Sequence, residues 1–198
     1  MDNNAYSDAV TLEYQRYGRN KSTLINKTYI ESGEYRRKFD LITTDANLAR
    51  LLYNKAKEML YHRSGTEYED MYWIDAKDCR IITSVTDEKV IEQITYTPAI
   101  LKRISESSNI VTMHTHPHSM PPSIEDINSC EQHKYSMSIV VCHNGRLFVY
   151  QSSQRISELL YDAYYSKHIR DGADEFDAQF AAIVDLQRGY DISVKEVL

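Results

Sequence analysis

The residues best suited to chemistry lie in two short groups near the middle of the chain. His114 and His116 are two residues apart at the end of a run rich in β-branched side chains, and Pro117 follows them. Side chains two apart in an extended segment point to the same face, so both imidazoles can face one metal ion. Ser123 and Asp126 stand three apart where a short helix should begin. The first turn of that helix would direct the Asp126 carboxylate back toward the strand end.

Two histidines and one carboxylate form a familiar ligand set for catalytic zinc, with the fourth position left for water. Zinc lowers the pKa of bound water to about 7, so a nucleophile becomes available near neutral pH. We therefore predict that His114, His116 and Asp126 bind zinc. For an isolated pair of histidines, ordinary polar residues at a strand end would be the simpler interpretation. The Ser123 hydroxyl has two compatible roles, since it could cap the helix or face the reacting water.

The pattern His-x-His-Pro, a proline-rich loop and Ser-x-x-Asp resembles the metal-binding signature of the JAMM (MPN+) metallopeptidases, including bacterial and prophage-type members. The matching positions are His114, His116, Ser123 and Asp126. The loop between Pro117 and Ser123 is one residue shorter than in the better-known members. The resemblance implies a cytidine-deaminase-like JAB/MPN fold, a bound Zn²⁺ and hydrolysis of a peptide or isopeptide bond in a protein or peptide substrate. In that chemistry the serine hydroxyl stabilises the oxyanion.

The resemblance also implies a glutamate on the first strand that acts as general base. Glu67 and Glu69 are both candidates, because they have the same parity in the segment that leads into that strand. Glu69 runs more directly into the apolar residues 71–74, and burial raises the pKa of a carboxylate toward the working pH. We favour Glu69 and keep Glu67 as the alternative, since a two-residue difference in register would exchange their roles.

Hydrophobic spacing and turn residues predict the elements that must position these groups. The predicted elements are a helix over 46–63 capped by Asp45, strands over 69–75 and 80–85, a helix from Thr97-Pro98, a strand over 109–114, a helix after Ser123, strands over 137–142 and 147–150, and helices beyond 153. Asn144-Gly145 marks a hairpin turn. This order predicts an α/β fold, a mixed sheet flanked by helices.

Three regions follow from these patterns. Residues 1–45 are polar and rich in tyrosine, which predicts an N-terminal arm of irregular chain or short elements. Residues 46–152 contain the predicted sheet and the metal motif, so they are interpreted as the JAB/MPN metallopeptidase domain. Residues 153–198 are predicted to form a C-terminal helical extension, and both flanking regions lie outside the resemblance.

The composition is typical of a globular protein, with 42% apolar and 26% charged residues. The formal net charge is −6 and no dense block of lysine and arginine occurs, so no nucleic-acid partner is expected. Three cysteines without a C-x-x-C pair argue against disulfides and thiolate zinc sites. Neither a secretory signal nor an apolar run of membrane-spanning length is apparent. We therefore expect a cytoplasmic protein that does not bind membranes, and the sequence does not indicate its oligomeric state.

Two other classes of protein share parts of this pattern. A catalytically inactive JAB-fold binding module is the main alternative, although such a protein would normally lack one or more metal ligands. A zinc nucleobase deaminase needs His-x-Glu with Pro-Cys-x-x-Cys, and a zincin needs His-Glu-x-x-His. Neither motif occurs in this chain, so the zinc peptidase stays the main hypothesis.

Overall fold

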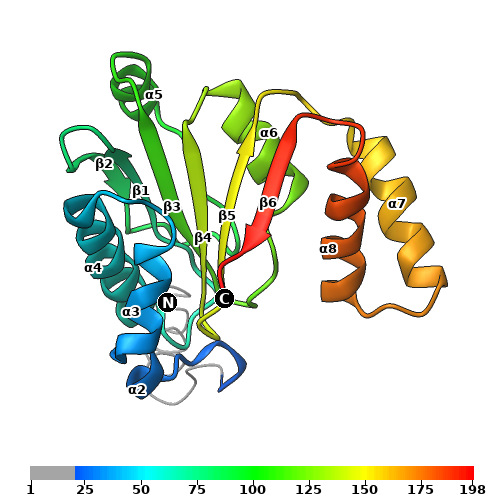
Figure 1. The fold of residues 1–198 in the computed structure, drawn as a ribbon, viewed down its shortest axis with the longest axis horizontal. Helices are drawn as coiled ribbons and strands as arrows, with labels where there is room; N and C mark the ends of the chain where they lie inside the picture. Colours follow the sequence, from blue (N-terminus) through cyan, green and yellow to red (C-terminus); the bar gives the residue numbers. More distant parts are fainter. Residues whose placement is uncertain (1–20) are drawn as a thin grey trace, which may run out of the picture.

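The computed structural model describes residues 21–198 and contains one six-stranded mixed sheet (Figure 1). The strand order is β2-β1-β3-β4-β5-β6. β3 and β4 are parallel, and every other neighbouring pair is antiparallel. The strands are β1 (Met71–Asp75), β2 (Arg80–Val85), β3 (Ile110–His116), β4 (Met137–Cys142), β5 (Leu147–Ser152) and β6 (Ile192–Glu196).

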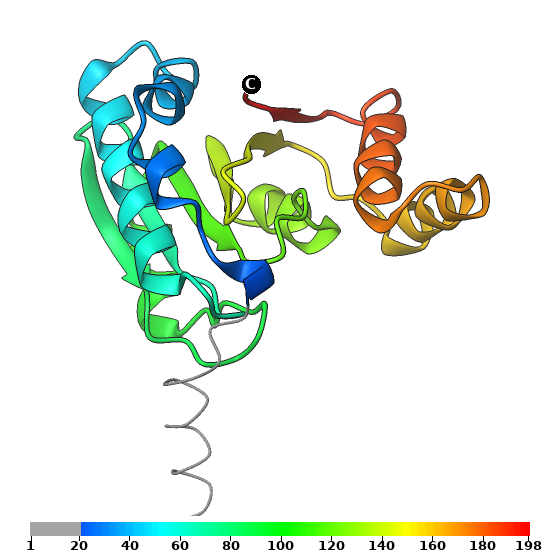
Figure 2. The ribbon, with the colours of Figure 1, turned by 90° about the horizontal axis from the view of Figure 1, so that it is seen from below.

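Helices cover both faces of this sheet, which gives three layers (Figure 2). α2, α3 and α4 cover one face, α5 and α6 cover the other, and the α7–α8 hairpin stands at the β6 end (Figure 1). No helix within residues 21–198 is both long and apolar enough to cross a membrane. The helices are a 3-10 turn η1 (Lys21–Thr23), α2 (Lys27–Ile30), α3 (Gly33–Asp40), α4 (Ala46–Arg63), α5 (Pro98–Ser105), α6 (Ile124–Gln132), α7 (Glu158–Arg170) and α8 (Glu175–Leu186).

The predicted α/β class and its mixed sheet flanked by helices are confirmed. α4 spans the predicted residues, and its cap is Asp45, whose carboxylate accepts from two backbone N–H groups at its start. α5 begins at Pro98, and the Thr97 hydroxyl accepts from the Ile100 amide. These local signals succeeded because a cap satisfies the free backbone donors of the helix that it precedes.

β3 supplies the strand that carries the two histidines, and its pleat divides the core. Val111 and Met113 are buried against α4, whereas Ile110 belongs to the apolar cluster on the opposite face. His114 and His116 have the parity of Ile110, so their side chains lie on the face covered by α6. The strand continues two residues beyond its predicted end at His114, and both histidines therefore belong to regular structure.

The C-terminal region differs from its prediction as a wholly helical extension. α7 and α8 are present, but the chain then returns to the sheet as β6, which pairs antiparallel with β5. Ile192 and Val194 are buried while Ser193 and Lys195 are exposed, the alternation of a half-buried strand. This alternation was not predicted as a strand, because the segment is short and follows a long helical pattern.

The predicted N-terminal arm is packed against the sheet over the part that the structure describes. Ile30, Tyr35 and Phe39 are fully buried in the apolar cluster under α4. The edge-on contact of Tyr35 with Phe39 has ring centroids 5.4 Å apart. The prediction named irregular chain or short elements, and over the described part these elements are short helices. Residues 1–20 of the predicted arm lie outside the described residues.

Candidate metal centre

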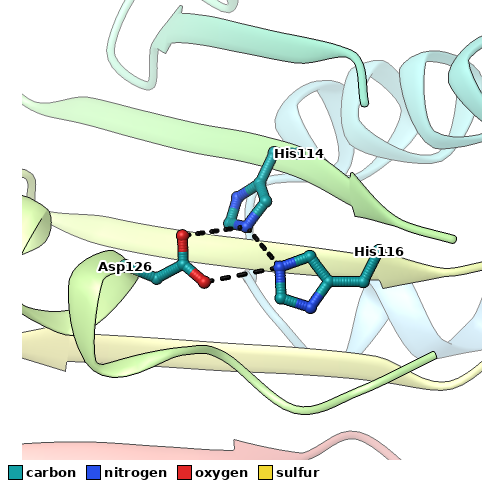
Figure 3. A group of neighbouring side chains, drawn as sticks. All are labelled: His114, His116 and Asp126. Carbon is teal, nitrogen blue, oxygen red and sulfur yellow. Dashed lines mark hydrogen bonds and ion pairs between the residues drawn. The ribbon is translucent and has the colours of Figure 1, made fainter. Parts of the chain in front are cut away.

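Three side chains converge where β3 ends and α6 begins (Figure 3). His114 Nε2 lies 3.0 Å from His116 Nε2 and 3.3 Å from Asp126 Oδ1. His116 Nε2 lies 3.4 Å from Asp126 Oδ2. Among residues 21–198 these three form the one group of three or more His, Cys, Asp or Glu residues whose donor atoms could share a metal ion. The three ligands predicted from the sequence are thus brought together.

The spacing of the donor atoms suits a small tetrahedral cation. Bonds of about 2.0–2.1 Å from zinc to nitrogen or oxygen place neighbouring ligand atoms roughly 3.3 Å apart. The two Nε2 atoms lie 3.0 Å apart, and each lies 3.3–3.4 Å from one of the two oxygens of the Asp126 carboxylate, distances close to that edge. Two imidazole nitrogens and a carboxylate oxygen are donors that zinc accepts, and three protein ligands leave a fourth position open. The residues present therefore fit zinc.

The orientation of His116 is set by the loop that follows it. His116 Nδ1 donates to the Met120 carbonyl at 2.9 Å, because a carbonyl can only accept. A hydrogen bond from one ring nitrogen leaves the other as the lone-pair donor, the usual arrangement of a metal-binding histidine. His114 is buried, and its Nδ1 has no hydrogen-bond partner among the described residues.

Ser123 and Asp126 form a capping box at the start of α6. The Ser123 hydroxyl accepts from the Asp126 amide at 3.0 Å and donates to Asp126 Oδ2 at 2.9 Å. The Ser123 amide also donates to Asp126 Oδ2 at 2.8 Å. These bonds cap the helix and at the same time direct the carboxylate toward the histidines. The capping role of Ser123 is thus present, and its proposed contact with a substrate oxyanion stays a prediction.

The electrostatics of this group reflect three ionisable side chains in close contact. Burial disfavours the charged form of His116, but Asp126 and Glu69 outweigh this effect and raise its pKa to about 9. Burial likewise acts to raise the pKa of Asp126, yet His114 and His116 hold it well below its usual range. The cluster therefore favours a positive charge between these groups, and a divalent cation in the same place would replace the proton of His116.

Glu69 lies beside the candidate ligands because of the register between β1 and β3. Met71 pairs with His114, so the antiparallel register places Glu69 opposite His116. Glu69 Oε1 lies 3.9 Å from His116 Nε2, and its side chain is only 9% exposed. Burial raises the pKa of Glu69, and the neighbouring histidines partly offset that effect. A buried carboxylate with a raised pKa beside the candidate ligands has the properties that a general base requires.

Glu67 occupies a different place, at the rim. Glu67 Oε1 lies 4.0 Å from His118 Nε2, and its side chain is 37% exposed. Glu92 approaches the same imidazole at 3.7 Å. His118 was interpreted as a surface residue of the loop, and its side chain is indeed 41% exposed. The two candidate bases are thus separated in space, Glu69 beside the metal ligands and Glu67 beside His118.

The candidate ligands His114, His116 and Asp126 line a cavity of about 850 Å³. Glu92 on the β2–α5 loop, Glu125 on α6 and Glu175 on α8 line it in addition to the acids of the metal group. Gln179 of α8 also lines the cavity, and its Nε2 donates to the carbonyls of residues 121 and 122, directly before Ser123. The C-terminal hairpin, which lies outside the sequence resemblance, therefore forms part of the wall.

Several groups around this centre were not found from the sequence. The Met120 carbonyl is a backbone atom, and no side-chain pattern could reveal it. Gln179 comes from a helix more than fifty residues away in the chain. Asp70 and Arg63 form a buried ion pair next to Glu69. Asp70 directly follows the candidate base in the sequence, which was the only available signal for that pair.

Comparison with known proteins adds no relative to this description. No family model, no curated protein and no solved structure matches the chain.

Proposed function

We propose that this protein is a zinc-dependent peptidase of the JAMM type, which hydrolyses a peptide or isopeptide bond. The observation that carries the proposal is the convergence of His114, His116 and Asp126 with donor atoms 3.0–3.4 Å apart and the buried Glu69 carboxylate 3.9 Å from His116. The order of these residues along the chain supports it, since it resembles the JAMM signature. The proposal also includes the more specific fold, in which the observed α/β architecture is a cytidine-deaminase-like JAB/MPN fold.

Zinc bound to the three ligands would act as a Lewis acid and lower the pKa of a water molecule into the neutral range. Glu69 Oε1 would accept a proton at that position and pass it to the leaving amine, a role supported by its place opposite His116, just before β1. Ser123 lines the same cavity, and its hydroxyl could donate to a developing oxyanion once it releases its hydrogen bond to Asp126 Oδ2. While the hydroxyl is bonded to the oxyanion, the Ser123 amide would still donate to Asp126 Oδ2 and keep the carboxylate oriented.

The substrate proposed is a protein or peptide. An extended segment fits a cavity of about 850 Å³ with walls from the β2–α5 loop and from α8. The cavity contains tyrosine and methionine side chains beside its acids, so it offers both apolar contact and hydrogen bonds to a polypeptide. A cytoplasmic location is part of the same proposal.

The metal is tested by elemental analysis of protein prepared without added metal. We expect about one zinc per chain, lost in the variant with both His114→Ala and His116→Ala. His118→Ala is the matched control, since it removes an imidazole from the loop that follows β3, outside the proposed ligand set. Stoichiometric zinc that survives the double substitution would sink the ligand assignment, and bound iron in place of zinc would change the chemistry proposed.

The peptidase activity is tested with a mixed peptide library and with an isopeptide-linked ubiquitin dimer, each analysed by mass spectrometry. We expect zinc-dependent cleavage that Glu69→Gln abolishes while zinc stays bound. Glu67→Gln is the matched control and should change turnover little, because that carboxylate lies beside His118 at the rim. The reverse pattern would move the base to Glu67.

The binding module is the alternative that this experiment separates. A zinc-loaded protein that cleaves no probe, with or without Glu69→Gln, would favour a JAB-fold domain that binds a partner without hydrolysing it. A protein without zinc that cleaves no probe would remove both the metal and the activity from the proposal.

A further inference from the structure

Two residues next to the candidate centre, Asp70 and Thr115, are hydrogen-bonded to each other. Asp70 directly follows Glu69, and Thr115 lies between His114 and His116. The Asp70 amide donates to Thr115 Oγ1 at 3.0 Å, and the Thr115 amide donates to the Asp70 carbonyl at 3.1 Å. These two bonds extend the β1–β3 pairing beyond the regular strand, up to the position where Glu69 faces His116.

The Asp70 side chain is fastened on the other side of the sheet, to the end of α4. Arg63 Nε donates to Asp70 Oδ1 at 2.5 Å, and His62 Nδ1 lies 2.8 Å from Oδ2. The side chains of Arg63 and Asp70 are 7% and 2% exposed. Arg63 Nη2 has no hydrogen-bond partner among the described residues, and the guanidinium lies 5.8 Å from the ring of Tyr68. The charge of this buried guanidinium is therefore balanced mainly by Asp70.

Such a pair is expensive to bury, and apolar residues of similar size often stabilise a fold equally well. Its use here is geometric. The ion pair holds Asp70 against α4, while the backbone of Asp70 is bonded to the amide and the hydroxyl of Thr115, so the residue before Asp70 is tied to the strand that carries the two histidines. A displacement of about 1 Å in a reacting group can cost roughly a hundredfold in rate, so a fixed distance matters at this point.

We infer that Asp70 is a positioning residue, which with Arg63 and Thr115 sets the place of the Glu69 carboxylate relative to the metal ligands. The inference rests on the proposed function, because it acts through the base assigned there. The Asp70 carboxylate points away from the metal group to α4, so it touches neither metal nor substrate.

The primary test uses Co²⁺ in place of zinc, because its visible spectrum reports the surroundings of the metal without any substrate. Glu69→Gln provides the reference change in the spectrum at one fixed pH. We expect Asp70→Asn to reproduce a large part of that change with Co²⁺ still bound at one per chain. Asp75→Asn is the matched control, since Asp75 also pairs with an arginine, Arg80 at 3.1 Å, but at the far end of the same strand. Its spectrum should equal that of the unaltered protein.

Because the loss of one partner from a buried ion pair can unfold a domain, a second variant is needed. Thr115→Val keeps the shape of the side chain and removes the acceptor of the Asp70 amide, whereas Thr115→Ser keeps the hydroxyl. We expect Thr115→Val to change the Co²⁺ spectrum in the direction of Glu69→Gln, and Thr115→Ser to leave it unaltered. Thermal unfolding of the apo forms shows which variants are folded.

Kinetics with whichever probe is cleaved provide the second measurement. Asp70→Asn should lower kcat roughly 10- to 100-fold with little change in KM. In the inactive Glu69→Gln background the readout is the Co²⁺ spectrum, which the same substitution should leave unchanged, because a residue that acts through Glu69 has nothing left to position.

The outcomes separate this inference from the function beneath it. Failure to bind Co²⁺, or a Glu69→Gln spectrum equal to that of the unaltered protein, overturns the proposed centre and the inference together. A clear Glu69→Gln change that neither Asp70→Asn nor Thr115→Val reproduces overturns only the positioning role. Equal spectral changes on Asp70→Asn in the presence and absence of Glu69 would show that Asp70 acts on the fold and not through Glu69, which also overturns the positioning role.

Discussion

Two side chains of the candidate centre, His116 and Asp126, are oriented by hydrogen bonds that serve a second purpose. The Met120 carbonyl binds His116 Nδ1, which presents Nε2 to the shared position. The capping box of α6 orients Asp126 while it satisfies the start of the helix. The same hydrogen bonds therefore satisfy the backbone and orient the groups that could bind a metal. A single substitution here should change both the stability of the fold and the chemistry, and the two effects can be measured separately.

Zinc affinity should depend on pH through His116. Its pKa is raised to about 9, so at pH 7 zinc has to replace the proton that His116 carries. The apparent affinity should rise about tenfold for each pH unit toward 9 and then level off. Competition with a chromophoric chelator at several pH values measures this slope. His118→Ala should show the same slope, and an affinity that is constant from pH 7 to 9 would contradict the prediction.

Replacement of Ser123 should separate its two roles. Ser123→Ala removes the cap of α6, at about 1 kcal/mol of unfolding free energy, and should slow hydrolysis about 10²-fold while zinc stays bound. Thr97→Ala is the control, since Thr97 caps α5 away from the centre. It should cost a similar unfolding free energy and leave turnover unchanged. Full activity in Ser123→Ala would limit this serine to capping.

The turn between β4 and β5 braces the loop that joins β3 to α6, the two elements that carry the candidate ligands. The His143 amide donates to the His116 carbonyl at 3.3 Å, and the Asn144 amide donates to Ser119 Oγ at 3.0 Å. Gly145 completes the turn at φ +87°, close against the ring of Tyr29 in α2. The predicted Asn-Gly turn therefore reverses the chain and also contacts the β3–α6 loop and α2.

Gly145→Ala should destabilise the protein for two reasons. A Cβ at this φ is strained, and it would lie 2.5 Å from Cε1 of Tyr29. We expect a loss of roughly 2–4 kcal/mol in unfolding free energy. Gly172→Ala isolates the backbone part, about 1 kcal/mol, because φ is +96° there but nothing lies within 4 Å of the added atom.

The measurement is urea unfolding in the presence of a chelator, so that metal binding does not contribute. Gly189→Ala is the neutral control, since its position is open and its φ lies outside the strained range. Equal losses at Gly145 and Gly172 would mean that the turn does not press against Tyr29.

At the scale of the whole molecule, the cavity is the meeting place of three separate regions of the chain. β3 and α6 provide the ligands, the β2–α5 loop provides one wall and α8 provides another. Glu92, Glu125 and Glu175 line it, and no lysine or arginine among residues 21–198 does so. The net charge of −6 has the same sign. A substrate segment with a positive charge should therefore be favoured over one with a negative charge.

Matched peptides with lysine, glutamine or glutamate beside the scissile bond test this expectation. The lysine peptide should exceed the glutamate peptide by about two- to fivefold in kcat/KM, since exposed charge pairs are weak. The ratio should fall with added salt. Glu175→Lys should reduce it, whereas Asp177→Lys, the same change of charge on α8 outside the cavity, should not. No preference between the peptides would contradict a role for the acidic lining.

The local features of this protein could be predicted from its sequence. The boundaries of α4, the caps Asp45, Thr97 and Ser123, and the two hairpins each depend on residues close together in the chain. The ligand pattern belongs to the same class, because two histidines on one strand and an aspartate one helical turn beyond a loop need only short-range geometry. Caps, alternation and turn chemistry act over a few residues, so they can be read without a tertiary structure.

Which distant groups join these local features depends on the packing of the whole chain. The pairing of Met71 with His114 places Glu69, and not Glu67, opposite His116. A register shift of two residues preserves every parity in the sequence, so periodicity could not make that choice. The return of β6 to the sheet and the bond from Gln179 to the proline loop also join segments far apart in the chain. Their positions depend on how whole layers pack, which no local pattern records.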